Sequence, residues 1–284
     1  MNSSIGKIVG EGTTALQNAE ITEPRMEAVS LLMHTLNVDR SFIIAHAGRE
    51  LSVTEVQRFR EFVRRRASRE PLQYITGVQE FFNLKFEVTP DVLIPRPETE
   101  LIVEAALDLL RATEAPIIAD VGTGSGCIAI SLLHEMPGAR AVGIDISSHA
   151  LTVARRNAER HAVSDRLSLT QADGFSTFRR HPIFSAIVSN PPYIRVQEVP
   201  SLQPEVRDHE PLSALVAGAD GLSHIRILVR DATHHLQTDG YFIFEMGFDQ
   251  SEAVRALVDP ANWDWVEIKN DLQNIPRVLV LRKK

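Results

Sequence analysis

The chain has 284 residues, a net charge of −7 and a sequence pI of about 5.8. Its hydrophobic residues (44%) and charged residues (24%) are ordinary for a globular protein and exclude extensive disorder. A single cysteine excludes a disulfide framework and a cysteine-rich zinc site, and we expect no metal. The longest apolar stretch, 115–130, is too short to span a membrane, and polar residues follow Met1 where an export signal would be apolar. We therefore expect a cytoplasmic protein with one large and one small domain.

Residues 1–75 are predicted to form a small helical domain. Pro24 opens a segment whose apolar residues recur at helical spacing, and Ser52-Val53-Thr54-Glu55 fits the capping box of a later helix. The domain has ten Lys/Arg against nine Asp/Glu, whereas the rest of the chain has 20 against 28. Two interpretations of its arginine run stay open, a solvated helix face or a docking face for an acidic macromolecule. The run consists of Arg58, Arg60, Arg64, Arg65, Arg66 and Arg69.

Residues 76–93 are predicted to form a β-hairpin that links the two domains. Phe82, Leu84, Phe86 and Val88 alternate with polar residues, which is the periodicity of a strand. The turn residues at 89–91 then end the hairpin.

Residues 94–284 are predicted to form an α/β domain. Strands that alternate with helices indicate a parallel sheet covered on both faces. The last two strands are joined by a short loop, which suits an antiparallel pair rather than another crossover. The predicted strands cover 117–121, 141–146, 167–170, 186–189, 241–244, 265–268 and 277–281, and the helices cover 127–135, 148–161 and 222–236.

A glycine-rich turn follows the first strand of this sheet. Its sequence, Asp120-Val-Gly-Thr-Gly-Ser-Gly126, lets the backbone approach a ligand at the carboxyl ends of the strands. Asp145 ends the second strand, where a carboxylate can accept hydrogen bonds from ribose hydroxyls, although it could also cap the following helix. A dinucleotide fingerprint needs Gly-x-Gly-x-x-Gly/Ala, whereas the spacing here is typical of S-adenosyl-L-methionine-dependent methyltransferases. We therefore expect this cofactor, with S-adenosyl-L-homocysteine as product, bound by Gly122, Thr123, Gly124, Ser125, Gly126 and Asp145.

Asn190-Pro191-Pro192-Tyr193 follows the fourth strand, at the same edge of the sheet as the glycine-rich turn. Because a residue before proline is restricted to extended geometry, the two prolines hold a stiff arch. The Asn190 side-chain oxygen and the Pro191 carbonyl can accept the two protons of a planar NH₂ group and so aim its lone pair at a methyl group. Tyr193 offers a flat face to the planar group. We predict catalytic roles for Asn190, Pro191 and Tyr193, and substrate binding by all four residues, with Asn190 also against the cofactor.

The arch does not by itself distinguish adenine, guanine or glutamine as the acceptor. A nucleic-acid adenine-N6 or guanine-N2 methyltransferase is the alternative, but the net charge of −8 outside the first domain disfavours it. An NAD-dependent oxidoreductase is disfavoured by the glycine spacing. A non-catalytic binding module is disfavoured because the glycine turn, the ribose acid and the arch are all intact.

These residues together resemble the release factor glutamine methyltransferases, the HemK/PrmC family. The resemblance covers nearly the whole chain and its motifs are specific in combination. It rests on the two motifs above, on Ile94-Pro-Arg-Pro-Glu-Thr-Glu100, on Glu210-Pro211 with Ala214-Leu215 and Gly218–Leu222, and on Phe244-Glu-Met-Gly247 with Gln250.

The resemblance implies a Rossmann-like class I methyltransferase sheet with an antiparallel C-terminal hairpin, preceded by a small helical domain, which we expect to dock the substrate. It implies methylation of the side-chain amide nitrogen of the glutamine in the Gly-Gly-Gln motif of class I peptide chain release factors. It further suggests that Arg96, Glu98 and Thr99 close over the cofactor. We expect a monomer that binds release factors and forms no stable complex with nucleic acid or membranes.

One departure from the family concerns the adenine contact. Some relatives carry a large aromatic residue after the acid in Gln171-Ala-Asp-Gly-Phe175, where this chain has Gly174. We place Asp173 and Gly174 beside the adenine, and Phe175 does not obviously replace the missing ring.

Overall fold

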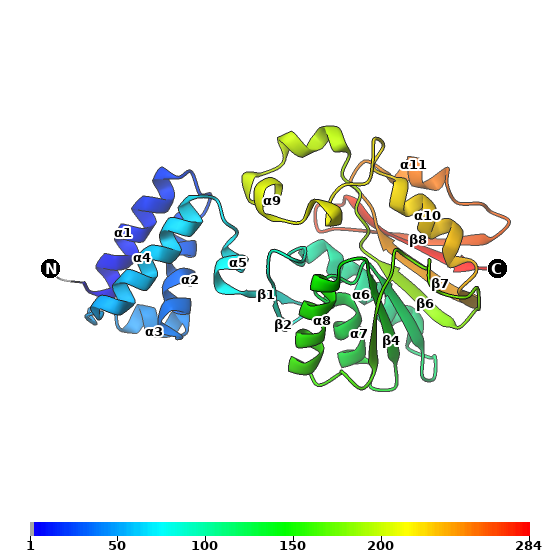
Figure 1. The fold of residues 1–284 in the computed structure, drawn as a ribbon, viewed down its shortest axis with the longest axis horizontal. Helices are drawn as coiled ribbons and strands as arrows, with labels where there is room; N and C mark the ends of the chain where they lie inside the picture. The colour runs from blue at the N-terminus through cyan, green and yellow to red at the C-terminus, as the bar shows by residue number, and fades with distance from the viewer. Residues whose placement is uncertain (1–2) are drawn as a thin grey trace. The chain divides into compact units, whose positions relative to one another are not determined.

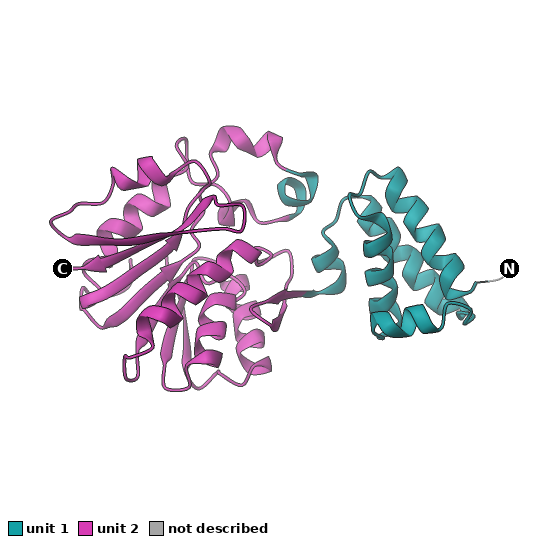
Figure 2. Cartoon of the chain, turned by 180° about the vertical axis from the view of Figure 1, so that it is seen from behind, with its two compact units in different colours: residues 1–78, 203–209 teal, residues 79–202, 210–284 magenta. Residues whose placement is uncertain are grey.

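The computed structural model describes residues 3–284, which divide into two compact units (Figure 2). Unit 1 comprises the chain up to Val78 together with Gln203–His209. Unit 2 comprises Gln79–Leu202 and Glu210–Lys284. The chain therefore passes between the units three times, because a short segment after the Asn-Pro-Pro-Tyr motif belongs to unit 1. Within the described residues, no helix is long and apolar enough to cross a membrane.

Unit 1 is a helical bundle around its own apolar core, which includes Leu16, Leu31 and Phe59. The second helix begins at Pro24, as predicted, and the fourth carries the predicted capping box, in which the Ser52 and Glu55 side chains each bind the other residue's backbone N–H. The helices of this unit, labelled in Figure 1, are α1 (Ile5–Asn18), α2 (Pro24–Leu36), α3 (Arg40–Ala45), α4 (Val53–Ala67), α5 (Leu72–Thr76) and α9 (Pro204–His209).

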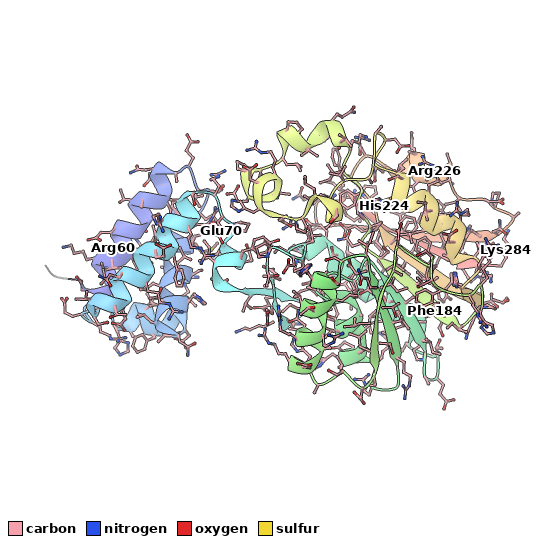
Figure 3. The ribbon with its side chains drawn as sticks, in the orientation of Figure 1. Arg60, Glu70, Phe184, His224, Arg226 and Lys284 are labelled. Atoms are coloured by element: carbon pink, nitrogen blue, oxygen red, sulfur yellow. The ribbon has the colours of Figure 1, made fainter. Side chains whose placement is uncertain are left out.

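The arginines of α4 differ in their surroundings. Arg66 is only 6% exposed and forms ion pairs with Glu27 of α2 and Glu205 of α9, at 2.5 and 3.0 Å. Three others form more exposed pairs, Arg60–Glu11, Arg64–Glu61 and Arg65–Glu70 (Arg60 and Glu70 are labelled in Figure 3). Arg66 thus belongs to the interior of unit 1, and the docking interpretation does not extend to it.

Unit 2 is built on a seven-stranded sheet in the order β5-β4-β3-β6-β7-β9-β8. Strands β3 to β7 are parallel, and β9 pairs antiparallel with both β7 and β8, which confirms the predicted parallel sheet with an antiparallel C-terminal hairpin. Its strands are β3 (Ile117–Val121), β4 (Arg140–Asp145), β5 (Leu167–Gln171), β6 (Phe184–Ser189), β7 (Leu236–Glu245), β8 (Trp263–Asn270) and β9 (Pro276–Lys283).

Helices cover both faces of this sheet. Successive residues of its strands point to opposite sides, so each face has its own apolar core. Along β6, Ala186 and Val188 pack in one core cluster and Ile187 in the other. The first face carries α6 (Glu100–Leu110), α7 (Cys127–Glu135) and α8 (Ser148–Arg160), and the second carries α10 (Ser223–Ala232) and α11 (Ser251–Arg255) (Figure 1). Short 3₁₀ helices occupy Pro97–Thr99, Val196–Ser201 and Leu212–Ala214.

Two local predictions were wrong. The helix predicted at 222–236 ends at Ala232, and Leu236 already begins β7, where it pairs with Phe184. Leu228, Ala232 and Leu236 follow one another at a spacing of four, so the helical period continued past the real end. A separate two-stranded sheet, β1 (Val78–Phe81) and β2 (Leu84–Glu87), lies within the predicted hairpin. Phe82 was predicted on a strand but lies in the turn, where its φ is +48°.

Candidate active site

Three neighbouring strands bring the predicted site residues to one edge of the sheet. Strands β4, β3 and β6 lie side by side and parallel, so that their carboxyl ends meet. A cavity of about 320 Å³ opens at this edge. Gly126 and Tyr193 do not line it, but the other predicted residues do: Gly122, Thr123, Gly124, Ser125, Asp145, Asp173, Gly174, Asn190, Pro191 and Pro192.

The glycine-rich turn has the backbone that its sequence predicts. Gly122, Gly124 and Gly126 have φ values of +75°, +54° and +82°, a backbone region that residues other than glycine rarely adopt. Gly126 precedes α7 rather than facing the cavity, and a Cβ there would lie 2.8 Å from Cδ1 of Ile130. The first two glycines therefore shape the ligand side of the turn, and Gly126 allows close packing against α7.

Asp145 holds the glycine-rich turn to the end of β4. Its Oδ2 accepts a hydrogen bond from the Gly124 N–H and its Oδ1 accepts one from the Ser147 N–H, both at 2.9 Å. The cap of α8 is Ser147, whose hydroxyl accepts from the Ala150 N–H. Burial raises the pKa of the Asp145 carboxyl. Each carboxylate oxygen retains a lone pair, so Asp145 can also accept ribose hydroxyls.

Asp120 lies in β3 just before the turn, and Cys127 begins α7 just after it and lines the cavity. Asp120 is fully buried and accepts hydrogen bonds from Thr123 Oγ1 at 2.7 Å and from the Ala129 N–H at 3.2 Å, and burial raises its pKa to about 6. Burial, with Asp120 nearby, raises the pKa of the Cys127 thiol to about 12. We therefore expect no nucleophilic role for Cys127, because a reactive cysteine needs its thiolate.

The cavity has no ring at position 174, where we predicted the adenine contact. Gly174 has a φ of +52°, and a Cβ added there would meet nothing within 4 Å. Phe175 points into the core, where its ring stacks on His235 at 4.3 Å between centroids, so it does not replace the missing aromatic residue. The cavity is also lined by Ile146, which is 60% exposed, and by His224 and Ile227 of α10 (His224 is labelled in Figure 3). Sequence reasoning missed these three residues.

The arch is joined to its surroundings by side-chain hydrogen bonds. Asn190 donates from Nδ2 to Thr99 Oγ1 at 2.9 Å, and Thr99 donates to Glu245 Oε2 at 2.6 Å. The Tyr193 hydroxyl donates to Glu245 Oε1 at 3.0 Å. Burial, with Glu245 nearby, raises the pKa of the Tyr193 hydroxyl. Glu245 is 1% exposed and was missed as a site residue, although it lies in the Phe244-Glu-Met-Gly247 motif.

A second set of contacts fixes the end of the arch. Ile194 forms an isolated bridge with Val216. Gln250, 2% exposed, donates from Nε2 to the carbonyls of Tyr193 at 3.0 Å and Gly221 at 3.2 Å. These bonds explain structurally why the motifs at 214–222 and 244–250 accompany the arch.

Arg96 and Glu98 do not close over this cavity. The Arg96 guanidinium pairs with Glu210, and that carboxylate also accepts from the Ile94 N–H at 3.3 Å. Of the three residues expected to cover the cofactor, only Thr99 lines the cavity. Arg96 instead joins the 94–100 motif to the Glu210-Pro211 motif within unit 2.

Comparisons with known proteins identify the family of this chain. The family model of the PrmC N-terminal domain matches residues 7–77, and that of the methyltransferase small domain matches residues 99–203. A release factor glutamine methyltransferase of Nitratidesulfovibrio vulgaris is 40% identical, covering 94% of this chain and 91% of its own length. One of Moorella thermoacetica is 42% identical, covering 89% of each chain. The chain belongs to the release factor glutamine methyltransferase family.

Solved structures agree on the fold. The hMettl16 catalytic domain, in complex with the MAT2A 3'UTR hairpin 6, superposes with a TM-score of 0.59 at 17% identity, covering 77% of this chain and 81% of its own. At this identity the likeness concerns the fold alone.

As a member of the release factor glutamine methyltransferase family, the chain is an S-adenosyl-L-methionine-dependent methyltransferase. The cavity fits this cofactor on its own geometry. Two positive-φ glycines leave the backbone bare on one wall, Asp145 offers acceptors to a ribose, and Gly174 leaves open space beside Asp173. The residues that would hold the cofactor are thus the glycine-rich turn, Asp145, Asp173 and Gly174.

Proposed function

We propose that this enzyme methylates the side-chain amide nitrogen of the glutamine in the Gly-Gly-Gln motif of class I peptide chain release factors. The observation that carries the proposal is the orientation of the Asn190 amide. Its NH₂ group is bound to Thr99 at 2.9 Å, which leaves Oδ1 as an acceptor at the wall of the cavity. An acceptor oxygen there suits an NH₂ group as substrate, and the family relatives are named for glutamine.

The arch orients the acceptor nitrogen. Asn190 Oδ1 and the Pro191 carbonyl accept the two N–H groups, which directs the nitrogen lone pair and stabilises the positive charge that develops on it. The bound cofactor supplies a methyl group carried by a positively charged sulfur. The nitrogen held by Asn190 and Pro191 would take up this methyl group as its bond to sulfur breaks, and S-adenosyl-L-homocysteine would leave. No base acts beforehand, because the amide nitrogen becomes acidic only once it is alkylated, and water then takes the proton.

Unit 1 is proposed to dock the release factor, and residues 94–284 to carry the chemistry, with 76–93 as the linker. Arg58 and Arg64 of α4 support the docking role. Both are exposed: the Arg58 guanidinium lies over the Phe62 ring at 5.4 Å, and Arg64 pairs with Glu61. We further propose that the enzyme is a cytoplasmic monomer that forms no stable complex with nucleic acid. This is consistent with a protein substrate that presents its glutamine on a loop.

The test is transfer of labelled methyl from S-adenosyl-L-methionine to a purified class I release factor. A matched factor whose Gly-Gly-Gln glutamine is replaced by alanine is run beside it. We expect label on the native factor and none on the variant. Label on DNA or RNA supplied in parallel, with none on either factor, would instead show that the enzyme is a nucleic-acid methyltransferase.

A further inference from the structure

Glu245 is a buried carboxylate that does not line the cavity and yet holds two residues of the site. It ends β7, is 1% exposed, and accepts one hydroxyl at each oxygen: Thr99 at 2.6 Å and Tyr193 at 3.0 Å. An unpartnered buried carboxylate is costly, so both hydroxyls are held firmly. The carboxylate is an acceptor toward both residues.

This arrangement fixes the direction of each hydrogen bond. The Thr99 hydroxyl has one proton, which it donates in the hydrogen bond to Glu245. Thr99 can therefore only accept from Asn190, so the amide of Asn190 must present its NH₂ to Thr99. Because the amide group is planar, its oxygen then faces the other way.

The direction matters because the two ends of an asparagine amide have almost the same shape and opposite chemistry. With Oδ1 toward the acceptor, Asn190 binds an NH₂ group. With Nδ2 there, it would present a donor to a donor and would instead suit a carboxylate. Nothing in the shape of the arch itself selects between the two orientations.

We propose that Glu245 is a positioning residue that makes the site selective for a primary amide over a carboxylate. It acts through Thr99 on the Asn190 amide and through the Tyr193 hydroxyl on the opposite end of the arch. This inference rests on the proposed function, since it assumes that the acceptor nitrogen meets Asn190. The selectivity is thus set by a residue that touches neither substrate nor cofactor.

The test uses Glu245→Gln and Thr99→Val in the full-length enzyme. Both changes release the direction of the Asn190 amide, so kcat should fall about 10- to 100-fold while the KM for S-adenosyl-L-methionine changes less than about threefold. Thr99→Ser keeps the hydroxyl and should retain far more activity than Thr99→Val. Thr35→Val, which removes a buried hydroxyl from α2 in unit 1, is the control for a loss of stability alone. The expected effects should exceed those of this control.

A second measurement distinguishes a change in substrate selectivity from a general loss of activity. Release factors whose glutamine is replaced by glutamate or by alanine are compared as competitive inhibitors. In the wild type the glutamate factor should bind more weakly than the alanine factor, because its carboxylate faces two acceptor oxygens. In Glu245→Gln that difference should shrink or invert. The inference would be overturned if the relative affinity for the glutamate and alanine factors were the same in Glu245→Gln and Thr99→Val as in the wild type. Wild-type kcat in Thr99→Val would also overturn it. Failure of the wild-type enzyme to label the native factor would instead overturn the proposed function.

Discussion

The backbone N–H of Gly124 donates to Oδ2 of Asp145 at 2.9 Å, which ties the glycine-rich turn to the end of the neighbouring strand. Asp145 therefore shapes the turn, and we predict that it also accepts hydrogen bonds from the ribose of the cofactor. Removing it in Asp145→Ala should weaken cofactor binding about 10- to 100-fold, because hydrogen bonds to a charged group contribute roughly 1.5–3 kcal/mol. Titration calorimetry measures this directly. Asp165→Asn removes an exposed acid elsewhere in unit 2 and should leave the affinity unchanged. Wild-type affinity in Asp145→Ala would exclude the ribose role.

Asn190 should affect chemistry far more than cofactor binding. Asn190→Ala removes the oxygen that accepts the substrate N–H and should abolish methyl transfer. The Kd for S-adenosyl-L-methionine should stay within roughly tenfold, or about 1.4 kcal/mol, because the glycine-rich turn and Asp145 are intact. Single-turnover methyl transfer and equilibrium binding are measured on the same sample. Transfer near the wild-type rate would show that the proposed amide orientation is wrong.

Gly221 should tolerate no side chain. Its φ is +74°, and a Cβ there would lie 2.5 Å from the Tyr193 carbonyl oxygen and 2.6 Å from Gln250 Nε2. Gly221→Ala should therefore displace the end of the arch, lower the free energy of unfolding by about 1–3 kcal/mol and reduce kcat. Gly138→Ala, where the nearest atom is 4.0 Å away, is the matched control and should change stability by less than about 0.5 kcal/mol. Equal effects of the two changes would contradict this account.

Asp120 should make stability depend on pH. Its pKa rises from an ordinary 3.8 to about 6 on folding, so the folded state binds more protons between these values. The stabilising contribution is complete below about pH 4 and is lost as the pH rises through about 6, a change of about 3 kcal/mol at 1.36 kcal/mol per unit. Asp120→Asn cannot titrate, so the variant should gain stability relative to wild type between pH 4 and 7. Chemical denaturation of both proteins without ligand measures this difference, and a constant difference would refute the prediction.

The elements that could be predicted from sequence are those whose signal lies within a few residues. The glycine-rich turn, the arch, the Ser52 capping box and the start of α7 all depend on neighbours in the chain. The helix end predicted at Leu236 rested on hydrophobic periodicity alone and was wrong, because apolar residues spaced by four do not mark where a helix ends.

The supporting residues of the site could not be predicted in the same way. Thr99 and Glu245 are 146 positions apart, and Thr99 and Asn190 are 91 apart, so only the fold brings them together. Nor could the charge pattern separate Arg66 from the exposed arginines, since its partners Glu27 and Glu205 come from distant segments. In both cases the sequence shows the residue type but not its partner.

The arginines of α4 should therefore divide into two groups by experiment. Arg58 and Arg64 are exposed, and reversal of both to glutamate should raise the KM for the release factor about fivefold at low salt, with less effect at high salt because exposed charges are screened. Their change in the free energy of unfolding should stay within about 0.5 kcal/mol. Arg66→Ala should instead destabilise unit 1 by about 3–5 kcal/mol, because it leaves the largely buried Glu27 without its partner and leaves Glu205 with Arg69 alone. Reversal of the exposed Arg111 and Arg230 of unit 2 to glutamate changes the charge equally and should leave the KM unchanged. If both double reversals raise the KM alike, overall charge and not a docking face on α4 controls the encounter.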